Sequence, residues 1–207
     1  FVGLQGSFGR GEANDQSDID MVLILDTMTA HDLKAYDAAI SKLPQREKIC
    51  GFIAGKQELF CWSKADLFQF YHDTTPLLGD LRALIPEITD DDVRCSILMG
   101  ACNIYHLCGH NIVHEKEPGI LKSLFKGAVF VAQALHYHRT GIYIKKHHEL
   151  SEMAAPRERQ ILSEYFKIRD VDADQDLDFN ALSETLFVWA GEVIQEFGRE
   201  STKNKKL

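Results

Sequence analysis

Residues 6–25 read GSFGRGEANDQSDIDMVLIL: a glycine-rich turn, then two carboxylates one residue apart, then an apolar run. The apolar run contains β-branched side chains, which favour a strand. Since alternate residues of a strand point to one face, Asp18 and Asp20 should project together. Two neighbouring carboxylates repel each other, and a hard divalent cation bound between them removes that repulsion. The spacing therefore predicts a magnesium site formed by Asp18 and Asp20.

The residues before the acid pair predict a turn that binds phosphate. Val2–Leu4 is the end of an apolar run and is expected to form a strand. Gly6 and Ser7 follow as a tight turn, which leaves backbone N–H groups and a hydroxyl group available to an anion. Arg10 adds a positive charge nearby. Turn and acid pair together predict a site for a phosphate-bearing ligand.

The whole pattern resembles a known family. Gly6 and Ser7, then ten residues, then Asp18 and Asp20 at the start of an apolar strand, are similar to the motif of the DNA polymerase β-like nucleotidyltransferase superfamily. The variant with Arg10 and Ser17 resembles the small, often prokaryotic members. The resemblance implies an enzyme that transfers a nucleoside monophosphate from a nucleoside triphosphate to an acceptor hydroxyl with Mg²⁺ as cofactor. It also implies nucleotide contacts from the turn, Arg10 and Ser17.

Sites of this superfamily commonly carry a third acid on a neighbouring strand, and two glutamates are candidates here. Glu47 directly precedes an expected strand over Lys48–Ala54, and Glu58 is the first residue of the expected strand Glu58–Trp62. We favour Glu47, because the family's third acid usually lies on the first strand after the second helix. It would act as the general base or as a third ligand to the metal, and Glu58 is its rival.

A finer resemblance covers most of the chain. The catalytic strands, the stretch from Glu58 to Trp62, and a helical bundle with basic residues after its long helix are similar to streptomycin-type aminoglycoside adenylyltransferases. This resemblance implies ATP as co-substrate and a small cationic acceptor such as an aminoglycoside. It implies that Trp62 receives the acceptor and that Lys145 and Lys146 hold the triphosphate. An alternative is a protein-modifying or antitoxin-type nucleotidyltransferase module that acts on a protein partner.

The charge of the chain limits its partners. The 207 residues carry a formal net charge of −8, which disfavours nucleic-acid binding because phosphate affinity depends on clustered lysine and arginine. A cationic acceptor fits this charge better. No apolar run approaches the roughly 20 residues that span a bilayer, so no membrane partner is expected. We expect a monomer or a homodimer.

The cysteines indicate a compartment. Five cysteines are an odd number, and none forms a C-x-x-C pair, so they predict buried free thiols in a reducing environment. The N-terminus lacks the charged and cleavage regions of a signal peptide. A cytoplasmic location is therefore expected. The five are Cys50, Cys61, Cys95, Cys102 and Cys108.

The order of elements predicts an α+β fold of two domains. Residues 1–80 are expected to form the nucleotidyltransferase domain around a small mixed sheet, and residues 81–207 a helical bundle. In the first domain we expect strand, short helix and strand over 1–26, and a strand pair formed by 48–54 and 58–62. Helices are expected there at 31–43 and 66–71. In the bundle, helices are expected at 89–108, 120–140, 156–166 and 180–197, with Gly109 and Gly141 as stops.

Overall fold

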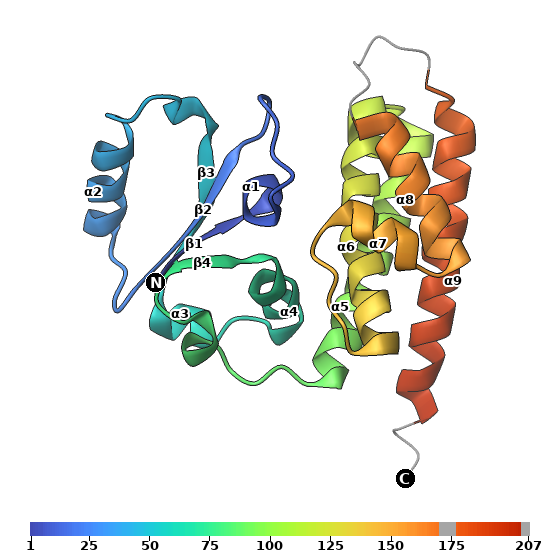
Figure 1. Ribbon diagram of the computed structural model, residues 1–207. Coiled ribbons are helices and arrows are strands. Elements are labelled where there is room, and N and C mark those ends of the chain that lie inside the picture. The colour runs from blue at the N-terminus through green and yellow to red at the C-terminus, as the bar shows by residue number, and fades with distance from the viewer. Residues whose placement is uncertain (170–176, 204–207) are drawn as a thin grey trace. The chain divides into compact units, whose positions relative to one another are not determined.

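The computed structural model describes residues 1–169 and 177–203, with side chains described as far as residue 198. The chain divides into two compact units, Phe1–Ile88 and Thr89–Leu207. The first is built on a small mixed sheet and the second on long helices (Figure 1). The predicted α+β class is confirmed. The first unit extends to Ile88 because Leu81 is buried in its core.

Four strands form the sheet of the first unit, in the order β3-β2-β1-β4. The central strands β1, Val2–Gln5, and β2, Ile19–Leu25, are antiparallel and are connected through the short helix α1, Gly6–Arg10. Strand β3, Ile49–Gly55, lies parallel to β2, and β4, Thr75–Leu78, is antiparallel to β1. The strand, short helix and strand expected over residues 1–26 are confirmed.

The first unit also contains several helices and 3₁₀ turns. They are α2 (Ala30–Ile40), the 3₁₀ turn η1 (Arg46–Lys48), α3 (Lys56–Phe60), α4 (Lys64–Asp73) and the 3₁₀ turn η2 (Leu81–Leu84). Helix α2 begins at a capping box formed by Thr29 and Asp32, which satisfies backbone donors at the helix start. The buried core combines strand and helix residues: Val22, Ile24, Ala54, Leu59, Leu67 and Leu81.

The predicted strand Glu58–Trp62 is wrong, because this segment forms α3 and its C-terminal cap. Lys56, Gln57 and Glu58 all have good helix propensity, and one helical turn suffices to bury Leu59 in the core, where it is 0% exposed. The fourth strand is Thr75–Leu78 instead. It contains Pro76, which an edge strand tolerates.

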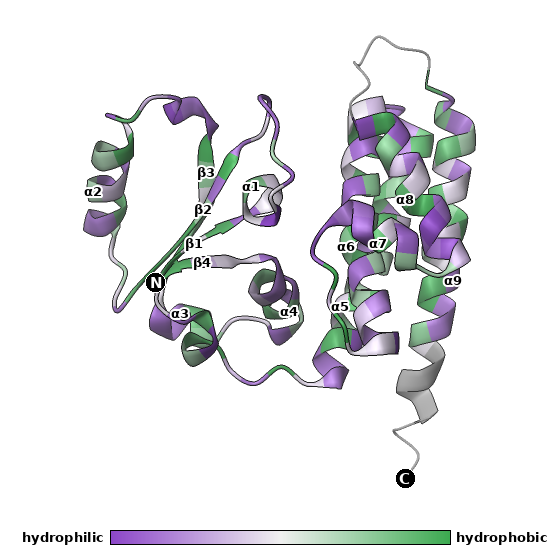
Figure 2. Cartoon of the chain, viewed as in Figure 1, coloured by the Kyte–Doolittle hydropathy of each residue, from purple (hydrophilic) through white to green (hydrophobic). Residues whose placement is uncertain are grey.

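The second unit is a helical bundle. Its elements are α5 (Asp90–His110), the π turn η3 (Asn111–Glu115), α6 (Pro118–Thr140), α7 (His147–Met153), α8 (Pro156–Arg169) and α9 (Phe179–Lys203). Helix α5 packs against α6 and α9, and α6 packs against α8. Figure 2 shows hydrophobic and hydrophilic residues on each long helix, as expected of amphipathic helices. Gly141 has a φ of +71° and ends α6 as predicted.

Gly109 does not end α5, contrary to the prediction. The helix continues to His110 and passes directly into the π turn. A Cβ on Gly109 would lie 3.3 Å from the ring of Phe187 on α9, so the glycine permits close packing of two helices. The chain turns later, at Lys116, which has a φ of +56°.

The prediction of buried cysteines is also wrong for four of the five. Cys50, Cys61, Cys95 and Cys102 are exposed free thiols, and Cys108 alone among the five is buried. The apolar neighbours of these cysteines in the sequence lie on other faces: the buried stripe of α5 includes Ile97, Ala101 and Ile104 but not its first two cysteines. Within residues 1–169 and 177–203, no helix is both long enough and apolar enough to cross a membrane.

Candidate functional site

The predicted turn and the second acid meet at one end of the central strands. The antiparallel register pairs Gln5 with Asp20, so the turn that starts at Gly6 begins beside the Asp20 carboxylate. Gly6 has a φ of +61°, and a Cβ there would overlap Asp20 Oδ2. Glycine is therefore required at this position both by the backbone conformation and by the carboxylate. Asp18 is exposed and lies one residue before β2, at the same end of the strand.

Helix α1 is a single closed turn that leaves the Ser7 hydroxyl available. The Gly11 N–H donates to Phe8 O (3.2 Å), and the Glu12 N–H donates to Ser7 O (2.8 Å). Gly11 is in the left-handed conformation that commonly ends a helix. Within the part of the chain that the structure describes, no group forms a hydrogen bond with Ser7 Oγ. A ligand at this turn can therefore bind the hydroxyl without breaking an internal contact.

Arg10 lies inside the protein rather than beside open solvent. It is 8% exposed. Its Nη1 lies 3.1 Å from Asp73 Oδ2, and its Nε lies 3.2 Å from Glu12 Oε2. The guanidinium is thus held between two carboxylates inside the protein.

Asp73 is a member of the site that the sequence did not suggest. It ends α4, is 6% exposed, and its Oδ2 accepts a hydrogen bond from the Gly6 N–H at 3.3 Å as well as from Arg10. Sixty-seven residues separate Gly6 from Asp73, and no local pattern links them. Its burial, which requires a partner for the carboxylate, is known only from the structure.

Ser17 shapes the loop that leads into the acid pair. Its Oγ accepts a hydrogen bond from the Asn14 N–H at 2.9 Å, and its N–H donates to Asn14 O at 3.0 Å. Lys48 Nζ donates to the carbonyl oxygen of Asp15, which ties this loop to the start of β3. The structure thus shows Ser17 in contact with its own loop.

The parallel register of β2 and β3 separates the two candidates for the third acid. Ile19 pairs with Ile49 and Leu25 with Gly55, so Glu47, in η1, lies at the same end of the sheet as Asp18. Glu58, in α3, follows the opposite end of β3. The seven residues of β3 span roughly 20 Å at the usual strand rise. Cys50, an exposed residue, is the direct partner of Asp20 in this register.

The remaining predicted site residues are Trp62, Lys145 and Lys146. Trp62 is 44% exposed and packs edge-to-face on Phe52 of β3, with ring centroids 5.4 Å apart. Lys145 and Lys146 belong to the second unit, between α6 and α7. Gln133 Nε2 donates to Lys145 O at 3.1 Å, and Lys146 Nζ lies 3.0 Å from Glu149 Oε1.

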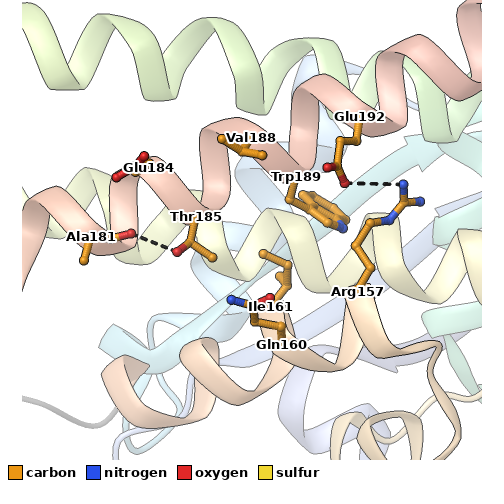
Figure 3. Close-up of a pocket in the computed structure, with 9 residues that line it drawn as sticks. All are labelled: Arg157, Gln160, Ile161, Ala181, Glu184, Thr185, Val188, Trp189 and Glu192. Carbon is orange, nitrogen blue, oxygen red and sulfur yellow. Dashed lines mark hydrogen bonds and ion pairs between the residues drawn. The ribbon is translucent and has the colours of Figure 1, made fainter.

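The second unit also contains a cavity of about 400 Å³ between α8 and α9 (Figure 3). Figure 3 shows Trp189 and Arg157 on its wall. Arg157 is already bound: its Nη2 lies 2.8 Å from Glu196 Oε2 and its Nε lies 3.0 Å from Glu158 Oε1. None of the predicted site residues lines this cavity.

Comparisons with known proteins identify the first unit. The sequence matches the family described as "Nucleotidyltransferase domain" over residues 1–71. Among solved structures, the chain is similar to spectinomycin adenyltransferase AAD(9) from Enterococcus faecialis, which was solved with ATP and spectinomycin. The likeness has a TM-score of 0.56 at 13% identity and covers 95% of this chain and 90% of that chain. No curated protein matches the sequence.

These findings confirm the predicted resemblance. Residues 1–71, which match the nucleotidyltransferase-domain family, contain the Gly6–Ser7 turn and the acid pair. The chain shares its fold with that adenyltransferase.

Proposed function

We propose that this chain is a Mg²⁺-dependent nucleotidyltransferase that moves AMP from ATP to a hydroxyl group of a small cationic acceptor such as an aminoglycoside. The observation that carries the proposal is the register of β1 with β2, which sets Asp20 beside the Gly6–Ser7 turn. The match of residues 1–71 to a nucleotidyltransferase domain supports the same type of reaction.

The triphosphate is assigned to Ser7 and the turn. The Ser7 hydroxyl is available there as a donor. Lys145 and Lys146 are proposed to supply further contacts from the second unit. The pair of Lys146 with Glu149 is exposed, with about half of each side chain accessible. Exposed pairs of this kind contribute little to stability, so Lys146 can exchange its carboxylate for phosphate.

The donor set at β2 fits a magnesium ion bound together with nucleotide. Among residues 1–169 and 177–203, no three His, Cys, Asp or Glu side chains form a metal-binding group. Mg²⁺ in nucleotide-dependent enzymes commonly takes one or two carboxylates and completes its shell with phosphate oxygens and water. Asp18 and Asp20 would hold the ion, which when bound would neutralise charge on the triphosphate.

The proposed reaction is a single displacement at the α-phosphorus. The acceptor oxygen forms a bond to this phosphorus, and the bond to the bridging oxygen of pyrophosphate breaks. Pyrophosphate leaves with the electron pair. The hydroxyl proton passes to Glu47, which is exposed at the same end of the sheet as Asp18 and is assigned as the general base.

A cationic acceptor is supported by charge and by one aromatic side chain. The formal net charge is −8, which attracts cations and repels anions at long range. Trp62 is 44% exposed, and an indole ring offers a favourable surface to a cationic ring compound. The similar adenyltransferase was solved with spectinomycin.

We also propose a cytoplasmic enzyme, because all five cysteines are free thiols, and we propose no nucleic-acid partner.

The test is a labelling panel. The protein is incubated with ATP labelled at the α-phosphate, with Mg²⁺ or with a chelator, and with spectinomycin, streptomycin, other aminoglycosides, neutral sugars or protein. We expect label on a cationic acceptor only with Mg²⁺, and weaker acceptor binding as salt increases, because salt screens charge. Label on a neutral sugar alone would contradict the assigned acceptor class. Label on protein alone would favour the protein-modifying alternative.

A further inference from the structure

We propose that Asp73 is a positioning residue of the nucleotidyltransferase site, which holds the Gly6 peptide and thereby fixes both the Gly6–Ser7 turn and the Asp20 carboxylate beside it. This inference rests on the proposed function and adds a residue that lies outside the sequence motif. Asp73 contacts neither nucleotide nor acceptor in this assignment. It acts through the backbone of the turn.

The charge and burial of Asp73 give the first argument. A carboxylate that is 6% exposed is unfavourable unless its oxygens are paired and hydrogen-bonded. Both oxygens of Asp73 lie within 3.3 Å of Arg10 Nη1, and Oδ2 also accepts from the Gly6 N–H. Arg10 is itself buried at 8% exposure. The two charges therefore stabilise each other in one geometry, and the Gly6 peptide is part of it.

The residues after Asp73 hold the other end of α1. Thr75 Oγ1 donates to Gly9 O at 2.6 Å, and Thr74 Oγ1 accepts from Gln5 Nε2 at 2.8 Å. A Cβ on Gly9 would lie 2.6 Å from Leu4 O, so α1 is packed closely on the end of β1. Three consecutive residues, from the end of α4 to the start of β4, thus bind α1 and the residue before it.

The consequence for the site follows from Gly6. Its N–H is bound to Asp73, and its α-carbon is so close to Asp20 that a Cβ would overlap the carboxylate. A shift of this peptide would move Ser7 and Asp20 together. Displacement of reacting groups by about 1 Å can lower turnover by about 10²-fold.

The test uses two double variants that differ only at position 73. Arg10→Met is combined with Asp73→Asn, which keeps an acceptor for the Gly6 N–H, or with Asp73→Leu, which has the same number of side-chain heavy atoms and the same branching but no acceptor. Arg10→Met removes the buried guanidinium from both, so neither variant leaves it unpaired. Thermal unfolding confirms that both are folded. Glu12→Gln, which removes the other carboxylate from Arg10, is the control.

The first readout is hydrogen exchange of the Gly6 amide measured by NMR, which needs no enzymatic activity. We expect exchange about tenfold faster with Asp73→Leu than with Asp73→Asn, as the loss of one hydrogen bond implies. Glu12→Gln should leave it unchanged. The second readout is transfer from ATP. We expect kcat/KM about 10²-fold lower with Asp73→Leu and a raised KM for ATP, which mere loss of folded protein does not change.

The two proposals fail in different ways. Equal Gly6 exchange and equal KM in the two double variants, with an active wild-type enzyme, would overturn the role of Asp73 and leave the proposed function standing. A wild-type protein that transfers no nucleotide to any acceptor would overturn the proposed function. In that case the Gly6 exchange still decides whether Asp73 fixes the turn.

Discussion

At the scale of single residues, Gly6 is required both by its backbone conformation and by the nearby Asp20 carboxylate. A comparison with Gly11, which has only the first requirement, separates the two. Gly6 and Gly11 both have positive φ, +61° and +71°, so alanine at either position is strained by about 1–2 kcal/mol. A Cβ on Gly11 meets nothing within 4 Å, whereas one on Gly6 overlaps Asp20. We expect Gly6→Ala to lose turnover and Gly11→Ala to lose only stability. Urea unfolding and transfer assays check this, and equal turnover in the two variants would contradict it.

The sequence predicted contacts between residues that lie close together along the chain. Gly6 and Asp20 could be placed together because a strand, a turn and an antiparallel strand bring them close whatever the rest of the chain does. Asp73 could not, since its contact with Gly6 spans 67 residues and depends on how α4 packs on the sheet. The burial of Arg10, which is 8% exposed, could not be predicted either, because a sequence shows the charge of a side chain and not its burial.

At the scale of elements, the direction of β3 supports Glu47 over Glu58 as the proposed third acid. The parallel pairing with β2 sets Glu47 at the end that carries Asp18 and sets Glu58 at the other end. We expect Glu47→Gln to lower turnover by about 10²- to 10⁴-fold, as for a general base, and Glu58→Gln to retain it. Steady-state assays and nucleotide titrations check both. If Glu58→Gln is the inactive variant, the assignment passes to Glu58.

Helix α4 gives a prediction on pH. Burial lowers the pKa of His72 to about 4, whereas an unfolded histidine titrates near 6.5. Below about pH 6.5 the unfolded chain binds the proton more strongly than the folded chain. The contribution of His72 to stability is thus full above this pH and is lost as the pH falls toward 4. Urea midpoints should fall less over this range in His72→Gln, and the exposed His31→Gln should behave as wild type. Parallel curves for His72→Gln and wild type would contradict it.

Helices with a strong pattern were predictable as elements, and short segments were not. Helix α6 was expected within two residues of its observed bounds, because a long apolar stripe and a glycine stop agree. Helix α3 has five residues, too few to distinguish a helical period from an alternating one. Strand β4 contains Pro76 and only four residues, and its pairing with β1 depends on long-range packing.

At the scale of the whole molecule, the sequence predicted a mixed sheet followed by a bundle, and the likeness to AAD(9) over 95% of the chain agrees with that order. The superfamily resemblance rests on the motif within residues 6–25, yet the shared fold extends far beyond it. An identity of 13% is compatible with a common fold because hydrophobic pattern and volume specify a core more than particular residues do. The acceptor depends on particular side chains, so the fold alone does not name it.

The most direct test of the nucleotidyl transfer proposed here is a comparison of Asp20→Asn with the wild type, using ATP labelled at the α-phosphate, Mg²⁺ and spectinomycin or an aminoglycoside. Asp15→Asn is the matched control, since Asp15 is an exposed acid of the same loop. We predict labelled acceptor with wild type and with Asp15→Asn, and a loss of about 10³-fold or more with Asp20→Asn, because a carboxylate that holds the metal supports several kcal/mol of transition-state stabilisation. Undiminished transfer by folded Asp20→Asn protein would contradict the site described here.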